Sequence, residues 1–153
     1  FLILLYIYIY YTHMLRIREI LVEDYEIMIK LLTQLTECTC SKEQFNNYIQ
    51  SLPKNEYIYI LESNDSVVAT GKLVIETKII RGLRSVGHIE DIVVDENSRG
   101  NGFGKILVNY LTASAENLGC YKVILDCDQS LARFYESCDL IYKGIQMAKY
   151  FNE

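Results

Sequence analysis

A glycine-rich segment, Arg99-Gly100-Asn101-Gly102-Phe103-Gly104-Lys105, separates two apolar stretches of this chain. The stretch before it, 89–94, has the composition of a strand, and the stretch after it has apolar residues at helical spacing. Glycines at a strand-to-helix turn leave backbone N–H groups bare, and these amides attract a phosphate together with the positive end of the helix. The segment therefore predicts a strand, a loop and a helix that together hold a pyrophosphate.

Composition places the chain among single-domain globular proteins. It has 153 residues, of which 50% are apolar and 23% charged, and it contains one proline. Such a chain can bury one core and has no disordered linker. The formal net charge of −5 argues against a nucleic-acid surface, because binding to a phosphate backbone requires a basic face. An anionic ligand must instead be held by a local cluster.

The cysteines are five in number, and no two of them form a C-x-x-C pair; they are Cys38, Cys40, Cys120, Cys127 and Cys138. With only two histidines beside them, they predict neither a zinc site nor the disulfide framework of a secreted protein. A nucleophilic cysteine would need a positioned base, so we interpret them as small, mostly buried hydrophobic residues. The expectation is a cytoplasmic protein with reduced thiols and no metal.

The first eleven residues, FLILLYIYIYY, are uncharged. The run is shorter than the roughly 20 residues of a membrane-spanning helix, and it lacks the basic start and small-residue cleavage site of a signal peptide. Met14 stands where the regular pattern begins. We therefore interpret residues 1–13 as a non-native extension and 14–153 as a single domain, and we expect no association with a membrane.

Hydrophobic periodicity predicts an α+β fold with a mixed, mostly antiparallel sheet and one β-α-β unit through the glycine-rich segment. Ser41 and Gln44 have the spacing of a capping box at a helix start, and Gly119 is expected to end a helix. The run 121–127 has the composition of a buried strand. The expected strands are 14–20, 57–62, 66–77, 86–94, 121–127 and 140–149, and the expected helices are 23–35, 41–52, 103–118 and 129–137.

The spacing of the glycines distinguishes between kinds of phosphate loop. A dinucleotide-binding loop needs G-x-G-x-x-G, whereas the glycines here follow G-x-G-x-G. A Walker A loop needs Ser or Thr after its lysine, and here Ile106 follows Lys105. The remaining pattern, R-x-x-G-x-G between a strand and a helix, resembles the pyrophosphate loop of the GNAT superfamily of acetyl-CoA-dependent N-acetyltransferases.

Three further segments sharpen this resemblance, namely 87–94 (GHIEDIVV), 119–128 (GCYKVILDCD) and 134–136 (FYE). From Lys78 to Tyr135 the chain resembles the eukaryotic glucosamine-6-phosphate N-acetyltransferase family. The resemblance implies the GNAT fold, a twisted sheet flanked by helices. It also implies transfer of the acetyl group of acetyl-CoA to the 2-amino group of D-glucosamine 6-phosphate, on the way to UDP-N-acetylglucosamine, by a homodimer whose subunits share the active site.

The same resemblance assigns the acetyl-CoA site. It places Glu90, Asp91 and Ile92 at the acetyl group, where a strand can offer the backbone amide near Ile92 to the developing oxyanion. Tyr135 would stand near the sulfur and protonate the leaving thiolate, and Asp126 would lie at the reaction centre. The pyrophosphate would rest on Ser98, Arg99, Gly100, Asn101, Gly102, Phe103 and Gly104.

The identity of the general base stays open between Asp126 and Glu90. Neighbouring side chains on a strand point to opposite faces, so only one of Glu90 and Asp91 reaches the reacting atoms. His88 shares the face of Glu90. Because no metal-ligand spacing surrounds His88, we interpret it as a hydrogen-bonded structural histidine, with a catalytic role as the alternative.

For the acceptor, the resemblance implies contacts from Thr36, from Glu90 and Asp91, and from the stretch Lys78, Ile79, Ile80 and Arg81. The cations of that stretch suit a sugar phosphate, although charged side chains in a turn are common on any surface. One position departs from the family pattern. The family tends to carry an arginine in its last strand, contributed across the dimer, whereas this chain has Tyr150, so the phosphate contact is expected to differ.

Two alternatives stand beside this interpretation. One is a GNAT enzyme that acetylates another small amine or a protein N-terminus, and the other is an acetyl-CoA-binding module without catalysis. A peptide acceptor would need a groove for its backbone, whereas a sugar phosphate needs the cations at 78–81. The presence of Glu90, Asp126 and Tyr135 together favours an enzyme over a binding module.

Overall fold

The computed structural model describes residues 15–151, so the extension expected over 1–13 lies outside the described part of the chain. The centre of the fold is a five-stranded sheet in the order β1-β2-β3-β4-β5. The first three pairings are antiparallel and β4 pairs with β5 in parallel, which confirms the predicted mixed sheet. The strands are β1 (Leu15–Glu19), β2 (Glu56–Ser63), β3 (Ser66–Thr77), β4 (Ser85–Val94) and β5 (Cys120–Ile124).

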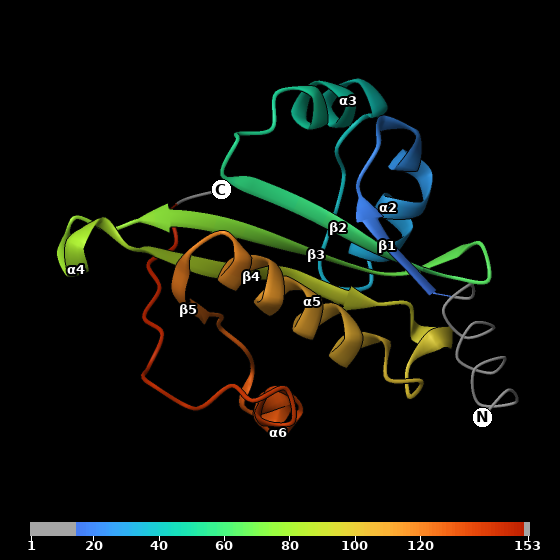
Figure 1. The fold of residues 1–153 in the computed structure, drawn as a ribbon. Coiled ribbons are helices and arrows are strands. Elements are labelled where there is room, and N and C mark those ends of the chain that lie inside the picture. The colour runs from blue at the N-terminus through green and yellow to red at the C-terminus, as the bar shows by residue number, and fades with distance from the viewer. Residues whose placement is uncertain (1–14, 152–153) are drawn as a thin grey trace, which may run out of the picture.

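Helices cover both faces of this sheet (Figure 1). The long helix α5 (Phe103–Asn117) connects β4 to β5 and completes the predicted β-α-β unit. Its Leu107 and Leu111 are fully buried and form the main core with side chains of β2, β3 and β4. No helix of the described residues is long and apolar enough to span a membrane.

The opposite face of the sheet carries α2 (Tyr25–Leu32) and α3 (Lys42–Gln50). A smaller core lies there, where Met28 and Phe45 pack with Ile58 and Ile60 of β2. Because successive side chains of a strand point to opposite faces, Ile60 contributes to this core and its neighbour Leu61 to the main one. The alternation of side chains along β2 thus divides its apolar residues between two cores, one on each face of the sheet.

Short-range signals set several element ends as predicted. Ser41 accepts a hydrogen bond of 3.2 Å from the Gln44 amide, and the Gln44 side chain accepts one of 2.7 Å from the Ser41 amide, which confirms the capping box. Gly119 follows α5 with a φ of 82°, a conformation that favours glycine. The short elements are η1 (Val22–Asp24), α4 (Ile80–Leu83), η2 (Glu96–Ser98), η3 (Gln129–Leu131) and α6 (Ala132–Glu136).

The C-terminal part of the chain differs from the prediction. The strand expected over 140–149 does not form, and residues 139–151 pair with no strand of the described chain. Ile145 and Met147 are 86% and 93% exposed. The strand expected over 121–127 does form, as β5, but it ends at Ile124 and is not buried: it is an edge strand whose Ile124 is 38% exposed. Because 140–149 does not pair with it, the outer edge of β5 stays uncovered among the described residues.

Arg18 on β1 ties the first helical turn to the sheet. Its guanidinium donates two hydrogen bonds of 2.8 Å to the carboxylate of Asp24 and one of 2.8 Å to Glu62 on β2. Asp24 is only 8% exposed and also accepts the Leu21 amide at 2.7 Å. Burial by itself raises the pKa of Asp24, but the bonds from Arg18 and Leu21 outweigh it and hold the pKa below its ordinary value of 3.8.

We expect Asp24→Asn to lower the free energy of unfolding at pH 7 by about 2 kcal/mol, because the change removes one partner of a largely buried ion pair. A carboxyl with a lowered pKa stabilises the fold above its unfolded pKa, and this contribution is lost as the pH falls through the folded value. The difference between variant and wild type should therefore shrink below about pH 4. Urea unfolding at several pH values measures it.

Asp65→Asn is the matched control, since Asp65 is exposed at the β2–β3 turn and asparagine tolerates its φ of 60°. This control should unfold like the wild type. If the Asp24 variant were equally stable at pH 7, or if its deficit persisted unchanged at pH 3, the network would not anchor the first turn.

Candidate active site

β4 and β5 pair over only the first part of β4. The parallel register runs from Ser85 opposite Cys120 to His88 opposite Ile124, where β5 ends. β4 continues to Val94, so one edge of its second half faces no strand of the described residues. The backbone groups on that edge are free to bind an extended ligand between the two strands.

A β-bulge in β4 lies in this unpaired half. Lys72 of β3 is opposite Glu90 and Thr70 is opposite Val93, so that Asp91 and Ile92 together face Gly71. Asp91 takes a φ of 52°, which places one extra residue in the strand. A bulge bends its strand, and here the bend occurs just beyond the point where β4 and β5 part. The bulge therefore shapes the opening between the two strands.

The glycine-rich loop follows β4 at the same end. Gly100 and Gly102 have φ values of 81° and 80°, which only glycine adopts without strain. Gly102 is the N-cap of α5, and no side chain caps this helix. The first amides of α5 are therefore bare and lie at the positive end of the helix, as an anion site requires. Arg99 is tied back to the Val94 carbonyl at 3.1 Å.

α6 brings Tyr135 to the loop. A Cβ on Gly104 would lie 3.1 Å from Cζ of Phe134, and the Phe134 and Tyr135 rings meet edge to face with centroids 4.9 Å apart. Burial raises the pKa of the Tyr135 phenol, with smaller contributions from Cys127 and Cys138. A phenol with a raised pKa keeps its proton at neutral pH, so Tyr135 can act as a proton donor.

Glu90 lies on β4 among other charged groups. Partial burial raises the pKa of its carboxyl, and the negative charges of Asp91 and Asp126 act in the same direction, whereas His88 and Lys72 oppose them. The predicted residues Asp91 and Asp126 therefore act electrostatically on Glu90. Carboxyls with a raised pKa are suited to general-base chemistry near neutral pH.

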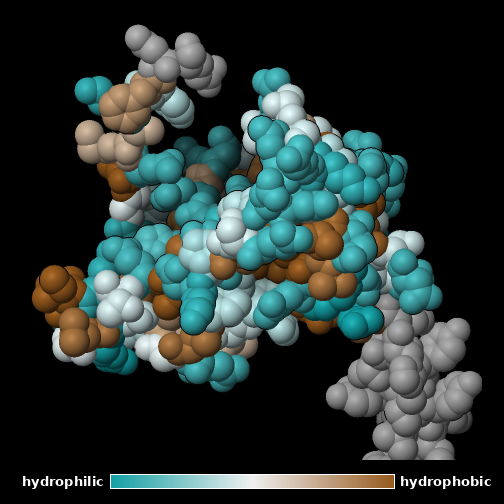
Figure 2. All heavy atoms as spheres, turned by 90° about the horizontal axis from the view of Figure 1, so that it is seen from above, coloured by the Kyte–Doolittle hydropathy of each residue, from teal (hydrophilic) through white to brown (hydrophobic). Residues whose placement is uncertain are grey.

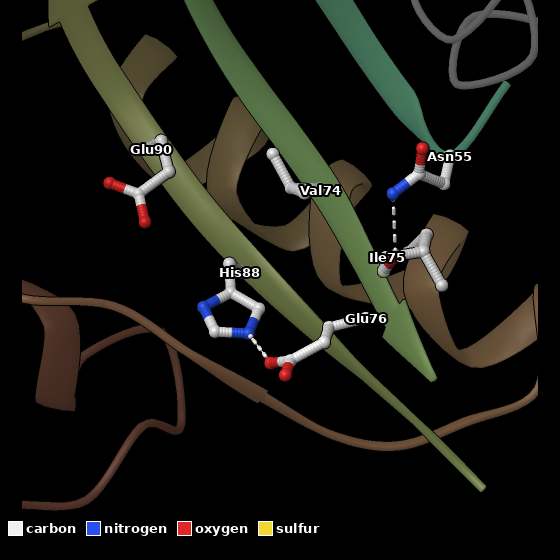
Figure 3. Close-up of a pocket in the computed structure, with 6 residues that line it drawn as sticks. All are labelled: Asn55, Val74, Ile75, Glu76, His88 and Glu90. Carbon is white, nitrogen blue, oxygen red and sulfur yellow. Dashed lines mark hydrogen bonds and ion pairs between the residues drawn. The ribbon is translucent and has the colours of Figure 1, made fainter. Parts of the chain in front are cut away.

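Figure 3 shows the open surface beside Glu90, a cavity of about 300 Å³ over the paired strands β3 and β4. Glu90 and His88 border it from β4, and Glu76 borders it from β3. His88 Nε2 and the Glu76 carboxylate lie 2.8 Å apart, so His88 is hydrogen-bonded as expected. The cavity is lined by Asn55, Val74, Ile75, Glu76, His88 and Glu90.

Lys72 is a residue of this region that the sequence did not single out. It lies opposite Glu90 in the β3–β4 register, and its Nζ contacts the Glu56 carboxylate at 2.5 Å and the Tyr48 hydroxyl at 2.9 Å. Nothing in the strand pattern of 66–77 distinguishes this lysine from any other polar strand residue. Its importance follows only from the register between β3 and β4.

The expected acceptor residues are not brought together within one chain. Thr36 is exposed near the C-terminal end of β4, where the neighbouring Gln34 binds Asp95 at 3.2 Å. The stretch 78–81 projects beyond the opposite end of β4, at the α4 turn (Figure 1). The 10 residues of β4 separate the two groups. A strand of this length spans about 33 Å, far more than a sugar phosphate.

Within the stretch itself, two cations have partners and two apolar residues do not. Lys78 contacts the Glu76 carboxylate at 2.5 Å, and the Arg81 guanidinium lies 5.2 Å from the centroid of the Tyr121 ring. Ile79 and Ile80 are 89% and 65% exposed. Apolar residues also stand out among polar ones on the face shown in Figure 2. An exposed apolar tip beside cations is a feature of surfaces that contact another molecule.

Comparison with known proteins defines the class to which this fold and site correspond. A profile of the Acetyltransferase (GNAT) family matches residues 14–140. The chain therefore belongs to the acetyltransferase (GNAT) family, and the five-stranded sheet with its flanking helices is the GNAT fold.

Within the family, the chain is similar to glucosamine 6-phosphate N-acetyltransferases. It is 42% identical to the glucosamine 6-phosphate N-acetyltransferase of Arabidopsis thaliana over 130 residues, which cover 81% of this chain and 87% of the relative. It is 40% identical to glucosamine 6-phosphate N-acetyltransferase 1 of Dictyostelium discoideum over 78% of this chain and 79% of that one. The crystal structure of the Arabidopsis thaliana enzyme superposes with a TM-score of 0.84, covering 90% of this chain and 99% of the other, at 38% identity.

Gly71→Ala tests the role of the bulge. A Cβ at this position would collide with Cδ1 of Ile92 and lie 3.1 Å from Cδ1 of Leu111, so Ile92 must turn away. We expect a loss of about 1–2 kcal/mol in the free energy of unfolding from overpacking. We also expect a weaker affinity for acetyl-CoA, because Ile92 lies on the unpaired edge. Chemical denaturation and calorimetric titration measure the two effects.

Ala69→Gly, two residues earlier on β3, is a control that alters the strand without crowding the bulge. It should lose stability but keep the affinity for acetyl-CoA. A Gly71→Ala variant with unchanged affinity would show that the bulge does not shape the acetyl-CoA site.

Proposed function

We propose that this protein transfers the acetyl group of acetyl-CoA to the 2-amino group of D-glucosamine 6-phosphate, giving N-acetyl-D-glucosamine 6-phosphate and CoA. The observation that carries this proposal is the unpaired half of β4, which contains Glu90, Asp91 and Ile92 and leads into the uncapped start of α5. The relatives of about 40% identity over most of the chain carry the corresponding name. The geometry of β4 and the names of the relatives together support acetyl transfer to D-glucosamine 6-phosphate.

Acetyl-CoA fits the opening between β4 and β5. Its pyrophosphate would bind the bare amides of the loop 98–104, and its extended pantetheine arm would pair with the free edge of β4. The backbone amide near Ile92 would donate to the thioester carbonyl, where negative charge develops during attack. One such oxyanion donor contributes about 3 kcal/mol to the transition state.

Three side chains would handle the protons. Glu90 is the proposed general base, because its raised pKa suits removal of a proton from the acceptor ammonium. Asp126 accepts a hydrogen bond of 3.0 Å from Gln146 and would orient the amine or hold the water between amine and base. Tyr135 would give its proton to the thiolate of CoA as the carbon–sulfur bond breaks.

The acceptor site is proposed to draw on two copies of the chain. Thr36 and the stretch 78–81 lie beyond opposite ends of β4, so one sugar phosphate cannot reach both within one subunit. A homodimer would bring the stretch of one copy to the site of the other. The exposed apolar residues of 139–151 and the open edge of β5 support such an interface. Tyr150, 91% exposed, would stand where the family carries its arginine.

The product would serve the synthesis of UDP-N-acetylglucosamine, in the cytoplasm.

The alternative of a different acceptor is tested by measuring CoA release from acetyl-CoA with D-glucosamine 6-phosphate, with D-glucosamine and with a peptide N-terminus. We expect kcat/KM for D-glucosamine to be about 100-fold lower, because the phosphate would form charge-assisted hydrogen bonds that contribute about 3 kcal/mol. Equal values for the two sugars, or faster turnover of the peptide, would contradict the assigned acceptor. CoA release at the background rate with every acceptor would leave only a binding module.

Tyr135→Phe tests the proposed acid. The change removes one hydroxyl, so we expect kcat to fall about 100- to 10,000-fold while the dissociation constant of acetyl-CoA stays the same. Tyr57→Phe is the control, because Tyr57 lies on β2 and stacks on Tyr59 in the core layer under α5. Rapid-quench turnover and calorimetry separate the two quantities. A Tyr135→Phe enzyme with wild-type kcat would remove Tyr135 from the mechanism.

A further inference from the structure

The cavity beside Glu90 holds a second pair of titratable side chains, His88 of β4 and Glu76 of β3. Glu76 lies diagonally opposite His88, because the register pairs His88 with Val74 and Glu76 with Val86. His88 Nε2 bonds to Oε2 of Glu76 at 2.8 Å, and Lys78 contacts the other oxygen, Oε1. Glu76 is thus fixed from two sides, and it fixes the orientation of the imidazole ring.

The second ring nitrogen of His88, Nδ1, lies on the cavity side of the ring. Figure 3 shows Nδ1 of His88 on the side of the ring away from Glu76. Among the described residues Nδ1 has no hydrogen-bond partner. His88 and Glu90 are two residues apart on one strand, so their side chains leave the same face about 7 Å apart at the backbone. One water molecule, held by the two side chains themselves, can bridge such a separation on this open surface.

The reaction leaves one proton to be removed. The acceptor enters as an ammonium ion and loses two protons as its nitrogen–carbon bond forms. The first of these protons returns to Tyr135, which gives its own proton to the thiolate when the carbon–sulfur bond breaks. The other must reach solvent in every turnover, and Glu90 must be free of it before the next ammonium arrives. A second acceptor next to Glu90 shortens this path.

We propose that His88 and Glu76 form a proton relay: His88 Nδ1 takes the proton from Glu90 through a water molecule, and Glu76 stabilises the resulting imidazolium until the proton reaches solvent. The proposal rests on the proposed function, because it deepens the mechanism of the same site. His88 acts through Glu90 and does not touch the substrate. Its role resembles that of other histidines whose second nitrogen is held by a carboxylate.

Other charges surround the pair and set the direction of its pH effects. On β3 these are Lys72, which faces Glu90, and Lys78, which is paired with Glu76. On β4 and beyond β5 they are the carboxylates of Glu90, Asp91 and Asp126, of which the last two act electrostatically on Glu90. Removal of the Glu76 charge makes an imidazolium at His88 less stable.

The central test is His88→Gln, in which the glutamine can keep a hydrogen bond to Glu76 but cannot carry a proton. We expect kcat for D-glucosamine 6-phosphate to fall at least about 10-fold, with KM for both substrates within about twofold of wild type. The dependence of kcat on pH should also change, because glutamine cannot exchange a proton at this position. In His88→Ala, added imidazole should restore kcat in a concentration-dependent manner, which a merely structural role of His88 would not allow.

Glu76→Gln provides a second, independent variant. It should lower kcat and alter its dependence on pH, because the imidazolium formed during the relay loses its stabilising carboxylate. Ser85→Ala is the control: it breaks the 3.3 Å contact between Ser85 and Thr77 on the same two strands, outside the residues that line the cavity. This control should keep the wild-type kcat and profile.

Three outcomes overturn the relay. They are a wild-type kcat and pH profile in His88→Gln, a rise in KM for the sugar at unchanged kcat, and a deficit in His88→Ala that imidazole does not rescue. The second outcome would make the pair a binding contact. If the wild type itself releases no CoA with the sugar phosphate, the proposed function fails and the relay with it. If the wild type releases CoA and the His88 variant is unaffected, only the relay is overturned and the proposed function stands.

Discussion

The site depends on the point at which two parallel strands stop pairing. β5 ends opposite His88, whereas β4 continues to Val94 and carries a bulge at Asp91. A strand edge inside a fold must satisfy its backbone groups, and here a ligand can do so. The free edge of β4 begins where β5 ends. The bare amides of α5 follow β4 in the chain, so they border the same opening.

Charge balance around this edge explains how an acidic chain can bind anions. Partial burial raises the pKa of Glu90, and the negative charges of Asp91 and Asp126 act in the same direction. Lys72 and His88 oppose these charges, and each is anchored by a second carboxylate. The groups of the loop that are proposed to bind the pyrophosphate are backbone amides, which carry no net charge. Local dipoles and paired charges would thus attract an anion that the total charge of −5 would repel.

Features that depend only on residues close together in the sequence could be predicted from it. The strand–glycine–helix unit, the capping box at Ser41 and the helix end at Gly119 need only local backbone preferences. Lys72 was missed because its place opposite Glu90 depends on a strand register that the bulge shifts. The strand expected over 140–149 was predicted from its own composition, but a strand also needs an edge to pair with. The outer edge of β5 is open, yet residues 139–151 do not pair with it, so local pattern alone could not decide the outcome.

A crystal structure of the protein with CoA and N-acetyl-D-glucosamine 6-phosphate tests the central claim most directly. The account predicts the pantetheine arm in the opening beyond His88 and Ile124, paired with the backbone of β4 near Ile92. It also predicts the pyrophosphate on the amides of the loop 98–104 and the acetamido group between Glu90 and Tyr135. CoA bound at another surface, or a β5 that continues its pairing along β4 past Ile124 and closes the opening, would contradict it.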